Sequence, residues 1–259
     1  MTSGGSSGTI APALLIAHRG ASGTRPENTL AAFREAMRLG ARSLECDVRL
    51  SRDGVPIILH DADLERTTDG RGPAREATLA EIRRLSAGYA MRFGDRHASE
   101  RVPTLEEVLR LARGAARLLI ELKWDFEDLE RCGALVQSVV DLIVATGASR
   151  DTALLSLDPG LLAEAGRLAP NLSRGLIASP GERGDPVAVA RSLGARLLVA
   201  PRAALGPALA DAARAAGLLL ATYTVDAPEE LDPLLPLGLH AFATDHPERF
   251  VGHPAARFV

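Results

Sequence analysis

Ile16–Gly20 (IAHRG) is followed closely by Arg25–Leu30 (RPENTL), and the rest of the chain can be interpreted from these two segments. The first is a short apolar run that ends in a histidine and an arginine, as a buried strand ends at the edge of a sheet. The glycine lets the chain turn, and Asn28 or Thr29 can cap a following helix, because both side chains accept hydrogen bonds from first-turn amides. The pattern predicts a strand with a proton-transfer group and an anion-binding group at its carboxyl end.

Short apolar runs alternate with helical patterns along the remaining sequence, which is typical of α/β proteins. The predicted strands are Leu14–His18, Ser43–Leu50, Arg117–Lys123, Thr152–Ser156, Gly175–Ala178, Arg196–Ala200, Leu218–Val225 and Ala241–Thr244. Eight such strands in a chain of 259 residues predict a (β/α)₈ TIM barrel that forms a single domain over residues 11–259. An open doubly wound sheet is the alternative, but no glycine-rich dinucleotide fingerprint follows a strand.

One long segment interrupts this alternation. Val55–His60 follows the turn at Asp53-Gly54 and is expected to extend the second strand, with His60 at its end. Residues 61–103 are rich in arginine, aspartate and glycine, with a short helix predicted near Leu79–Leu85. We expect this segment to be an insertion over the barrel mouth that shapes access for the substrate.

The composition excludes several classes of protein and indicates where in the cell the protein is expected. The net charge of −3 and the pI near 6.1 argue against a nucleic-acid-binding protein. Two cysteines, Cys46 and Cys132, do not make a disulfide framework. No apolar run approaches the roughly 20 residues that span a bilayer, so stable membrane anchoring is not expected. Residues 1–10 contain a glycine- and serine-rich stretch without a positive region, which predicts a disordered tail and a cytoplasmic protein. The oligomeric state stays open.

Three acidic side chains fall near the carboxyl ends of predicted strands. Glu45 and Asp47 share one face of their strand because side chains alternate, and Glu121 shares a face with Lys123. Three carboxylates directed into one barrel mouth would repel each other unless a cation joins them, and oxygen ligands favour Mg²⁺ or Ca²⁺ over zinc. The sequence predicts one such divalent cation, and the alternative is that these acids pair with arginines.

Lys123 is the only lysine among 30 basic residues, so its position at a strand end indicates a function that arginine does not serve. Three carboxylates and one divalent ion leave a charge of −1, which Arg19 and Lys123 raise to +1. That excess suits a phosphodiester monoanion, and the planar guanidinium of Arg19 can contact phosphate oxygens. Histidines at the same mouth could transfer protons near neutral pH.

The order of these motifs resembles the glycerophosphodiester phosphodiesterases, particularly the small bacterial cytosolic ones. The resemblance runs from Ile16 to about Phe250 and rests on His18-Arg19-Gly20, Pro26–Thr29, Glu45-Cys46-Asp47, Leu59-His60-Asp61 and Glu121-Leu122-Lys123. It implies hydrolysis of a small-molecule glycerophosphodiester to glycerol 3-phosphate and an alcohol. It also implies catalytic roles for His18 and His60, and metal binding by Glu45, Asp47 and Glu121. Tyr223 matches a position where the family carries Trp or Tyr, whereas Asp226 departs from the usual Asn.

Several roles are left open at this stage. We expect His18 to accept a proton and His60 to donate one, and Glu27 either to contact the substrate or to serve a helix N-terminus. A lysophospholipase-D-like or cyclising activity on a lipid is a second possibility, in which Tyr89, Met91 and Phe93 would meet an acyl chain; packing of the insertion is preferred for them. A non-catalytic phosphodiester-binding barrel would lack a histidine or a ligand, and none is missing.

Overall fold

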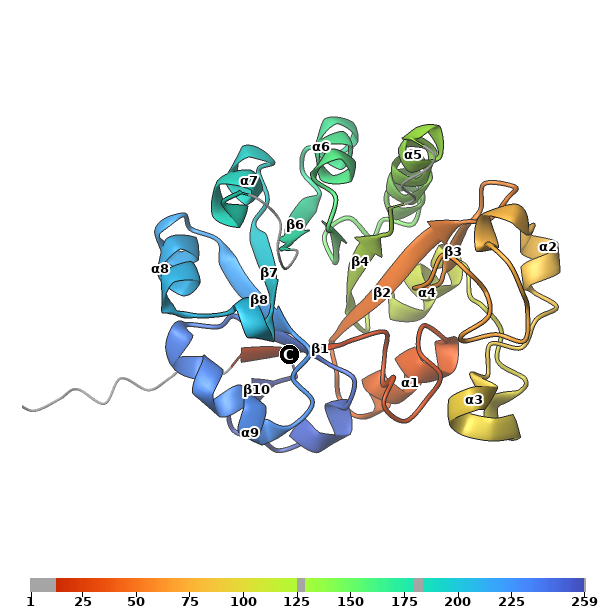
Figure 1. Ribbon diagram of the computed structural model, residues 1–259, viewed down its shortest axis with the longest axis horizontal. Coiled ribbons are helices and arrows are strands. Elements are labelled where there is room, and N and C mark those ends of the chain that lie inside the picture. Colours follow the sequence, from red (N-terminus) through yellow and green to blue (C-terminus); the bar gives the residue numbers. More distant parts are fainter. Residues whose placement is uncertain (1–12, 125–128, 179–183, 259) are drawn as a thin grey trace, which may run out of the picture.

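The computed structural model describes residues 13–124, 129–178 and 184–258, and these form a closed parallel barrel (Figure 1). Its strands are β1 Ala13–Ala17, β2 Ser43–Leu50, β4 Arg117–Leu122, β5 Thr152–Ser156, β6 Ser173–Ile177, β7 Leu197–Pro201, β8 Leu219–Tyr223 and β9 Ala241–Thr244. Each strand pairs in parallel with its neighbour, and β1 closes the ring by pairing with both β9 and β2. The predicted TIM barrel is confirmed.

Helices surround the strands, as Figure 1 shows most clearly for those that follow β4 to β7. The helices of the outer ring are α1 Leu30–Arg38, α4 Leu105–Ala112, α5 Leu129–Ala145, α6 Pro159–Leu168, α7 Pro186–Ser192, α8 Pro207–Ala215 and α9 Pro228–Leu231. Of the two caps considered for α1, Thr29 is the one that accepts from the Ala32 amide, and Thr104 forms a capping box with Glu107 at α4. Such caps satisfy first-turn amides and start each helix at a defined residue.

Alternation along the strands separates the packed outer core from the barrel interior. Cys46 and Val48 belong to the large core cluster between strands and helices, and Leu122 belongs to it as well. Glu45 and Asp47 alternate with Cys46 and Val48 along β2, and they therefore point inward. Cys46 and Cys132 are both buried, and neither forms a disulfide.

The chain after β2 does not continue in the same direction, which corrects one expectation. β3 Pro56–Ile58 runs antiparallel to β2, with Val48 opposite Ile58, so the segment is the return strand of a hairpin. The turn between them is tight, because Gly54 adopts a positive φ of 79° and Ser51 accepts its amide hydrogen. The amide of Leu59 then donates to the Asp47 carbonyl, which carries His60 back beside the carboxylates.

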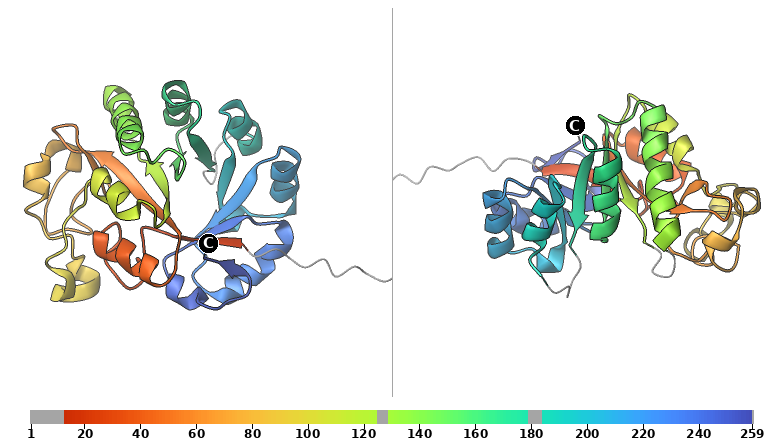
Figure 2. Two further views of the ribbon diagram at one scale, coloured as in Figure 1. Left: turned by 180° about the vertical axis from the view of Figure 1, so that it is seen from behind. Right: turned by 90° about the horizontal axis from the view of Figure 1, so that it is seen from above.

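The insertion is a small folded unit with its own core. It contains η1 Ala74–Glu76, α2 Leu79–Ile82, α3 Ala90–Phe93 and η2 Gly94–His97, and its helices lie beside the barrel in Figures 1 and 2. A separate cluster of buried residues packs it together: Ile57, Leu59, Leu64, Ala74, Ile82, Ala87 and Val102. Because its helices lie beside the barrel, the expected position over the mouth is wrong for them. The first turn of the insertion, in contrast, reaches the site.

The remaining elements follow the barrel strands or close the chain. They are η3 Arg202–Ala204, η4 Asp232–Leu237, η5 Pro247–Phe250 and a short strand β10 Ala256–Arg257, which pairs with β1 and was not predicted. The predicted tail over residues 1–10 lies outside the described residues. Across the described ranges, every helix is too short or too polar to cross a lipid bilayer.

Candidate active site

A cavity of about 180 Å³ opens among the carboxyl ends of the strands and contains most of the predicted site. Its polar lining comes from β1, β2, β4, β8 and the return from β3: His18, Arg19, Glu45, His60, Glu121, Lys123, Thr222 and Tyr223. Its remaining lining is apolar, mostly from β5 to β9: Ile16, Leu119, Leu155, Leu157, Ile177, Val199, Ala221 and Ala243. Seven of the eight predicted site residues line this cavity, and the eighth, Asp47, lies buried behind it.

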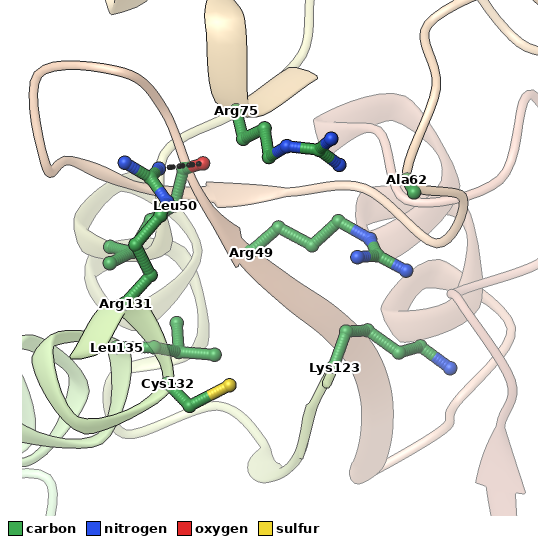
Figure 3. A pocket seen from close by; sticks show the side chains of 8 residues that line it. All are labelled: Arg49, Leu50, Ala62, Arg75, Lys123, Arg131, Cys132 and Leu135. Carbon is green, nitrogen blue, oxygen red and sulfur yellow. Dashed lines mark hydrogen bonds between the residues drawn. The ribbon is translucent and has the colours of Figure 1, made fainter. Parts of the chain in front are cut away.

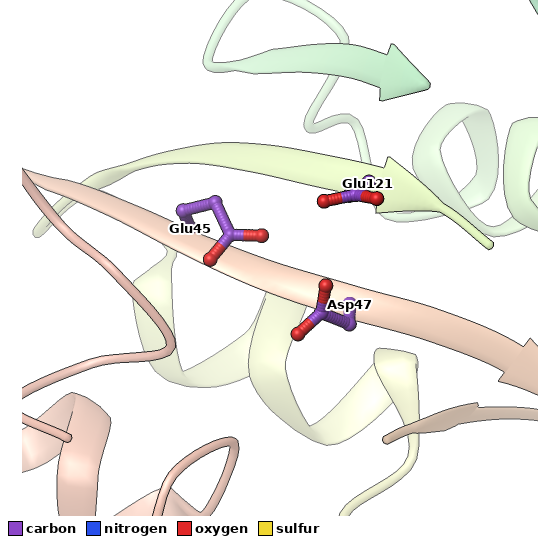
Figure 4. A group of neighbouring side chains, drawn as sticks. All are labelled: Glu45, Asp47 and Glu121. Carbon is purple, nitrogen blue, oxygen red and sulfur yellow. The ribbon is translucent and has the colours of Figure 1, made fainter. Parts of the chain in front are cut away.

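The three predicted carboxylates converge on one point (Figure 4). Asp47 on β2 is paired in register with Glu121 on β4, and Glu45 lies two residues before Asp47 on the same face. All three side chains are buried, and one carboxylate oxygen from each lies within 4.8 Å of the others. Three oxygen donors at this spacing, shielded from water, match the donor set that a hard divalent cation prefers.

Within the part of the chain that the structure describes, His18 is the only basic residue within ion-pair distance of Glu45. The Oε2 of Glu45 accepts the backbone amide hydrogen of Arg19 at 3.0 Å, whereas its buried Oε1 accepts no hydrogen bond from any residue that the structure describes. Burial and the charge of the nearby Asp47 carboxylate together raise the pKa of Glu45 to about 8. A buried carboxylate oxygen without a donor is the kind of atom that a cation would satisfy.

Asp47 and Glu121 do have basic partners, so the alternative of pairing holds for two of the three acids. Lys123 Nζ lies 2.8 Å from Asp47 Oδ1 and 2.6 Å from Glu121 Oε1. Asp47 Oδ2 also accepts a hydrogen bond from Asn28 at 2.7 Å and lies 3.2 Å from Arg19 Nε. Burial opposes the charged form of Asp47, but Lys123 and Arg19 outweigh it and hold its pKa below the usual range.

His18 lies immediately after β1, and carboxylates flank both of its ring nitrogens. Nδ1 lies 2.7 Å from Asp245 Oδ1, and since a carboxylate only accepts, Nδ1 carries the shared proton. Nε2 lies 4.0 Å from Glu45 Oε2. Ser22 donates to Asp245 and fixes that carboxylate. Burial works against protonation of His18, yet the hydrogen bond that it donates to Asp245 and the charge of Glu45 raise its pKa above the ordinary value.

His60 sits across the cavity in a more cationic environment. Its Nδ1 lies 2.6 Å from Asp61 Oδ1, so Asp61 orients the ring. Burial lowers the pKa of His60, and the charges of Lys123 and Arg19 lower it further, although Asp47 opposes them. The surroundings therefore favour His18 as the protonated member and His60 as the neutral one, which reverses the expected order of donor and acceptor.

Arg19 is held by acids and not left open to solvent. Its Nη1 lies 2.8 Å from Glu27 Oε1, and its Nε faces Asp47. Arg19 also has a positive φ of 56°, and the backbone turn there directs its amide hydrogen at Glu45. Glu27 bridges Arg19 and Arg66, and it is Thr29 that caps α1, so the expected role of Glu27 at a helix N-terminus is not seen; contact with the substrate stays a prediction.

A second pocket adjoins the site and shares Lys123 with it (Figure 3). It lies between β2 and the start of α5 and is lined by Arg49, Leu50, Ala62, Arg75, Lys123, Arg131, Cys132 and Leu135. Arg49 Nε donates to the carbonyl of His60 at 3.0 Å, and Arg131 donates to the carbonyls of Leu50 and Ser51. These contacts fix the backbone on both sides of the hairpin that presents His60.

The remaining candidates divide between the site and the scaffold. Tyr223 lines the cavity, and Asp226 accepts hydrogen bonds from the Thr244 hydroxyl and the Asp245 amide, so it shapes the loop behind His18. Met91 is 89% exposed, whereas Phe93 is buried and Tyr89 packs edge-on against it, with ring centroids 6.2 Å apart. The packing role preferred for Tyr89 and Phe93 fits this arrangement.

Sequence reasoning missed three residues that hold the site together: Asn28, Arg66 and Asp245. Asn28 was considered only as a helix cap, and yet its side-chain amide bridges to Asp47 at 2.7 Å. Asp245 follows a strand end, which was the available signal, but its pairing with His18 spans 227 positions in sequence. No local pattern distinguished Arg66 from the other arginines of the insertion.

Comparisons with known proteins agree over most of the chain. The sequence profile of the glycerophosphoryl diester phosphodiesterase family matches residues 18–249. A glycerophosphodiester phosphodiesterase from Caldanaerobacter subterraneus subsp. tengcongensis is 34% identical over 239 residues, which cover 92% of this chain and 96% of that protein.

Two solved structures are also similar. One is an Oleispira antarctica phosphodiesterase in complex with the product sn-glycerol-3-phosphate, with a TM-score of 0.84, 30% identity, and coverage of 92% of this chain and 94% of that one. The other is a glycerophosphodiester phosphodiesterase from Agrobacterium tumefaciens strain C58, with a TM-score of 0.79, 30% identity, and coverage of 93% and 99%. The likeness extends beyond the motifs to the whole barrel.

Proposed function

Because the chain belongs to the glycerophosphoryl diester phosphodiesterase family, we propose that it uses one divalent cation, Mg²⁺ or Ca²⁺, to hydrolyse glycerophosphodiesters to glycerol 3-phosphate and an alcohol. The chain is a glycerophosphodiester phosphodiesterase, and hence a phosphoric diester hydrolase. The observation that carries the proposal is the buried cluster of Glu45, Asp47 and Glu121, of which Glu45 and Glu121 line the same cavity as the two histidines. A single domain over residues 11–259 and a cytoplasmic location stay predictions.

The cation would be held by Glu45, Asp47 and Glu121, and the unsatisfied Oε1 of Glu45 supports this assignment. When bound, such a cation supplies Lewis-acid stabilisation of negative charge on phosphoryl oxygens. The protein's own contribution is to keep the three acids fixed: Asn28 and Arg19 hold Asp47, and the Arg19 amide holds Glu45. The apolar half of the cavity limits competing water around the phosphate.

His18 and His60 form the acid–base pair of the proposed mechanism. Both side chains line the cavity, each with a carboxylate on Nδ1 that leaves Nε2 for the substrate. In this assignment His60 removes a proton from the attacking oxygen, and His18 delivers one to the alkoxide that leaves. The attacking oxygen is either water or the neighbouring hydroxyl of the glycerol, and the same pair serves both routes.

Lys123 and Arg19 supply the positive charge that faces the phosphodiester, and Tyr223 closes the opposite side of the cavity. Lys123 is a compact point charge that already reaches two carboxylates at 2.8 and 2.6 Å. A guanidinium is wider and planar, so it cannot occupy the same position between those oxygens.

We therefore expect Lys123→Arg to lose nearly as much activity as Lys123→Ala, even though it preserves the charge. Steady-state kinetics on glycerophosphocholine would measure both variants beside the wild type. Arg110→Lys is the matched control, because Arg110 makes an exposed pair with Glu106 on α4, far from the cavity lining. Wild-type turnover in Lys123→Arg would show that only the positive charge at this position matters and not the compact shape of the ammonium group.

One assay tests the proposed function directly. Glycerol 3-phosphate release would be followed from glycerophosphocholine and glycerophosphoethanolamine, and choline release from a lysophosphatidylcholine, each with EDTA, with EDTA followed by Mg²⁺, and with EDTA followed by Ca²⁺. We expect release from the glycerophosphodiesters, its loss in EDTA, and recovery with one of the two ions. Full activity after exhaustive chelation would refute the metal assignment, and choline release from the lysolipid alone would favour the lipid phosphodiesterase alternative.

A further inference from the structure

Arg66 lies in the first turn of the insertion and contacts two carboxylates that each hold a residue of the candidate site. Its Nε and Nη2 donate to Asp61 at 2.6 and 3.0 Å. Its Nη1 and Nη2 donate to the two oxygens of Glu27 at 2.8 Å each. Four charge-assisted hydrogen bonds of this length fix the guanidinium in one plane and fix both carboxylates against it.

Each carboxylate continues to a different residue of the cavity. Asp61 accepts from Nδ1 of His60 at 2.6 Å, and Glu27 accepts from Arg19 Nη1 at 2.8 Å. The result is one chain of contacts, His60–Asp61–Arg66–Glu27–Arg19. From these contacts we propose that Arg66 is a positioning residue. It aligns His60 on one side of the phosphate with Arg19 on the other, and this role rests on the proposed function.

The surroundings of Arg66 show that its placement is built into the fold. The turn that carries it is closed by the amide and hydroxyl of Thr68, which both donate to the Leu64 carbonyl. Tyr89 lies against the guanidinium at 5.5 Å, and its hydroxyl is 3.5 Å from Arg66 Nη1. Leu64 belongs to the buried core of the insertion, so the position of Arg66 depends on the packing of that unit. The insertion thereby contributes to the geometry of the site and not only to access.

The contacts of Arg66 with Asp61 and with Glu27 should affect different kinetic parameters. Through Asp61, Arg66 holds the ring of a proton-transfer group, so its loss should lower kcat. Through Glu27, it holds a group that faces the phosphate, so its loss should also raise KM. Displacement of groups that orient reactive side chains typically costs about 10–100-fold in activity. We expect Arg66→Ala to show a decrease in kcat of this size together with a rise in KM.

A double-mutant cycle separates this role from general destabilisation. Arg66→Ala would be combined with His60→Ala and, separately, with Arg19→Ala, and kcat and KM would be measured on glycerophosphocholine. Where His60 is already absent, Arg66→Ala should no longer change kcat but should still raise KM. Where Arg19 is absent, the effect on KM should disappear and the effect on kcat should remain. A loss of the same factor in every background would overturn the proposal.

Two further variants keep the test decisive. Arg83→Ala is the matched control, because Arg83 belongs to the same insertion and pairs with Glu107 at 2.8 Å without touching the site; it should leave kinetics unchanged. Arg66→Lys retains one charge without the planar fork and covers the case in which the alanine variant does not fold. It should show intermediate values of kcat and KM, and wild-type values would refute the proposal. Inactivity of the wild-type protein itself would refute the proposed function instead.

Discussion

Glu45→Gln is expected to lower kcat/KM for glycerophosphodiesters by on the order of 10³-fold, which corresponds to roughly 4 kcal/mol of transition-state stabilisation. The amide is nearly isosteric with the carboxylate but removes one of three anionic oxygens that lie within 4.8 Å of one another. Buried oxygens of both Glu45 and Asp47 have no hydrogen bond among the described residues, but the Asp47 oxygen lies 2.8 Å from Lys123 Nζ, so the charge of Glu45 is the one that the protein alone explains least.

The same substitution should stabilise the metal-free protein. Burial raises the folded-state pKa of Glu45 from 4.5 to about 8, so the folded protein binds this proton more tightly than the unfolded chain. Stability is consequently lost as pH rises between these two values, and glutamine removes that loss. In EDTA, the melting temperature of Glu45→Gln should exceed that of the wild type by more at pH 8 than at pH 5. Function would then oppose stability at this position.

Calorimetric titration with Mg²⁺ and Ca²⁺ provides a readout that does not depend on turnover. Binding should weaken strongly in Glu45→Gln and stay unchanged in Glu164→Gln, a matched control whose carboxylate pairs with Arg167 on the exposed face of α6. Asp47→Ala should also lose activity, but it should destabilise the protein, because it leaves Lys123 and Arg19 buried beside one acid fewer. Undiminished cation binding by Glu45→Gln would contradict the assigned ligand set.

The barrel could be predicted from sequence because each strand is a local pattern. β2 at Ser43–Leu50, β5 at Thr152–Ser156 and β9 at Ala241–Thr244 have the predicted bounds, and the others differ by a few residues at most. The expected direction of β3 was wrong, because the sequence of an extended segment is the same whether it continues the preceding strand or runs back antiparallel to it. The turn at Asp53-Gly54 was predicted, and because Asp-Gly is a strong hairpin turn sequence, the same pair also indicated an antiparallel return.

The residues of the site could be predicted from the sequence, but the hydrogen bonds and ion pairs that join them could not. Alternation along β2 places Glu45 and Asp47 together, so their shared face followed from the sequence. The partners that set the state of each histidine lie elsewhere: Asp245 is 227 positions from His18, and Arg66 reaches His60 through Asp61. Charge at a histidine depends on these tertiary neighbours. These neighbours cannot be identified from the sequence, and the order of donor and acceptor expected from the sequence is the opposite of the one that they favour.

His18→Ala and His60→Ala are each expected to lower kcat by about 10²–10⁴-fold, the usual contribution of one general acid or base. The structure assigns them different environments: Asp245 and Glu45 flank His18, whereas Lys123 and Arg19 act on His60. A proton on His18 is stabilised by the first pair, and a neutral His60 is favoured by the second. We therefore expect His18 to donate to the leaving alkoxide and His60 to accept from the nucleophile.

A substrate with an acidic leaving group distinguishes the two roles. Glycerophospho-p-nitrophenol needs little protonation of its leaving oxygen, so it should restore much of the rate of His18→Ala and little of that of His60→Ala. His253→Ala serves as control, since His253 lies near the chain end and outside the cavity lining. Equal responses of both variants to leaving-group acidity would refute the assignment, and rescue of His60→Ala alone would restore the order expected from the sequence.

The pH dependence of kcat/KM gives an independent check, with the sign fixed by the two roles. The acceptor must be neutral, so the rate should fall as pH drops through the lowered pKa of His60. The donor must be protonated, so the rate should fall as pH rises through the raised pKa of His18. Because the two values move apart, the wild type should show a broad maximum between the limbs. His60→Ala should lose the acidic limb and His18→Ala the alkaline one; retention of both limbs in both variants would exclude these histidines as the groups that titrate.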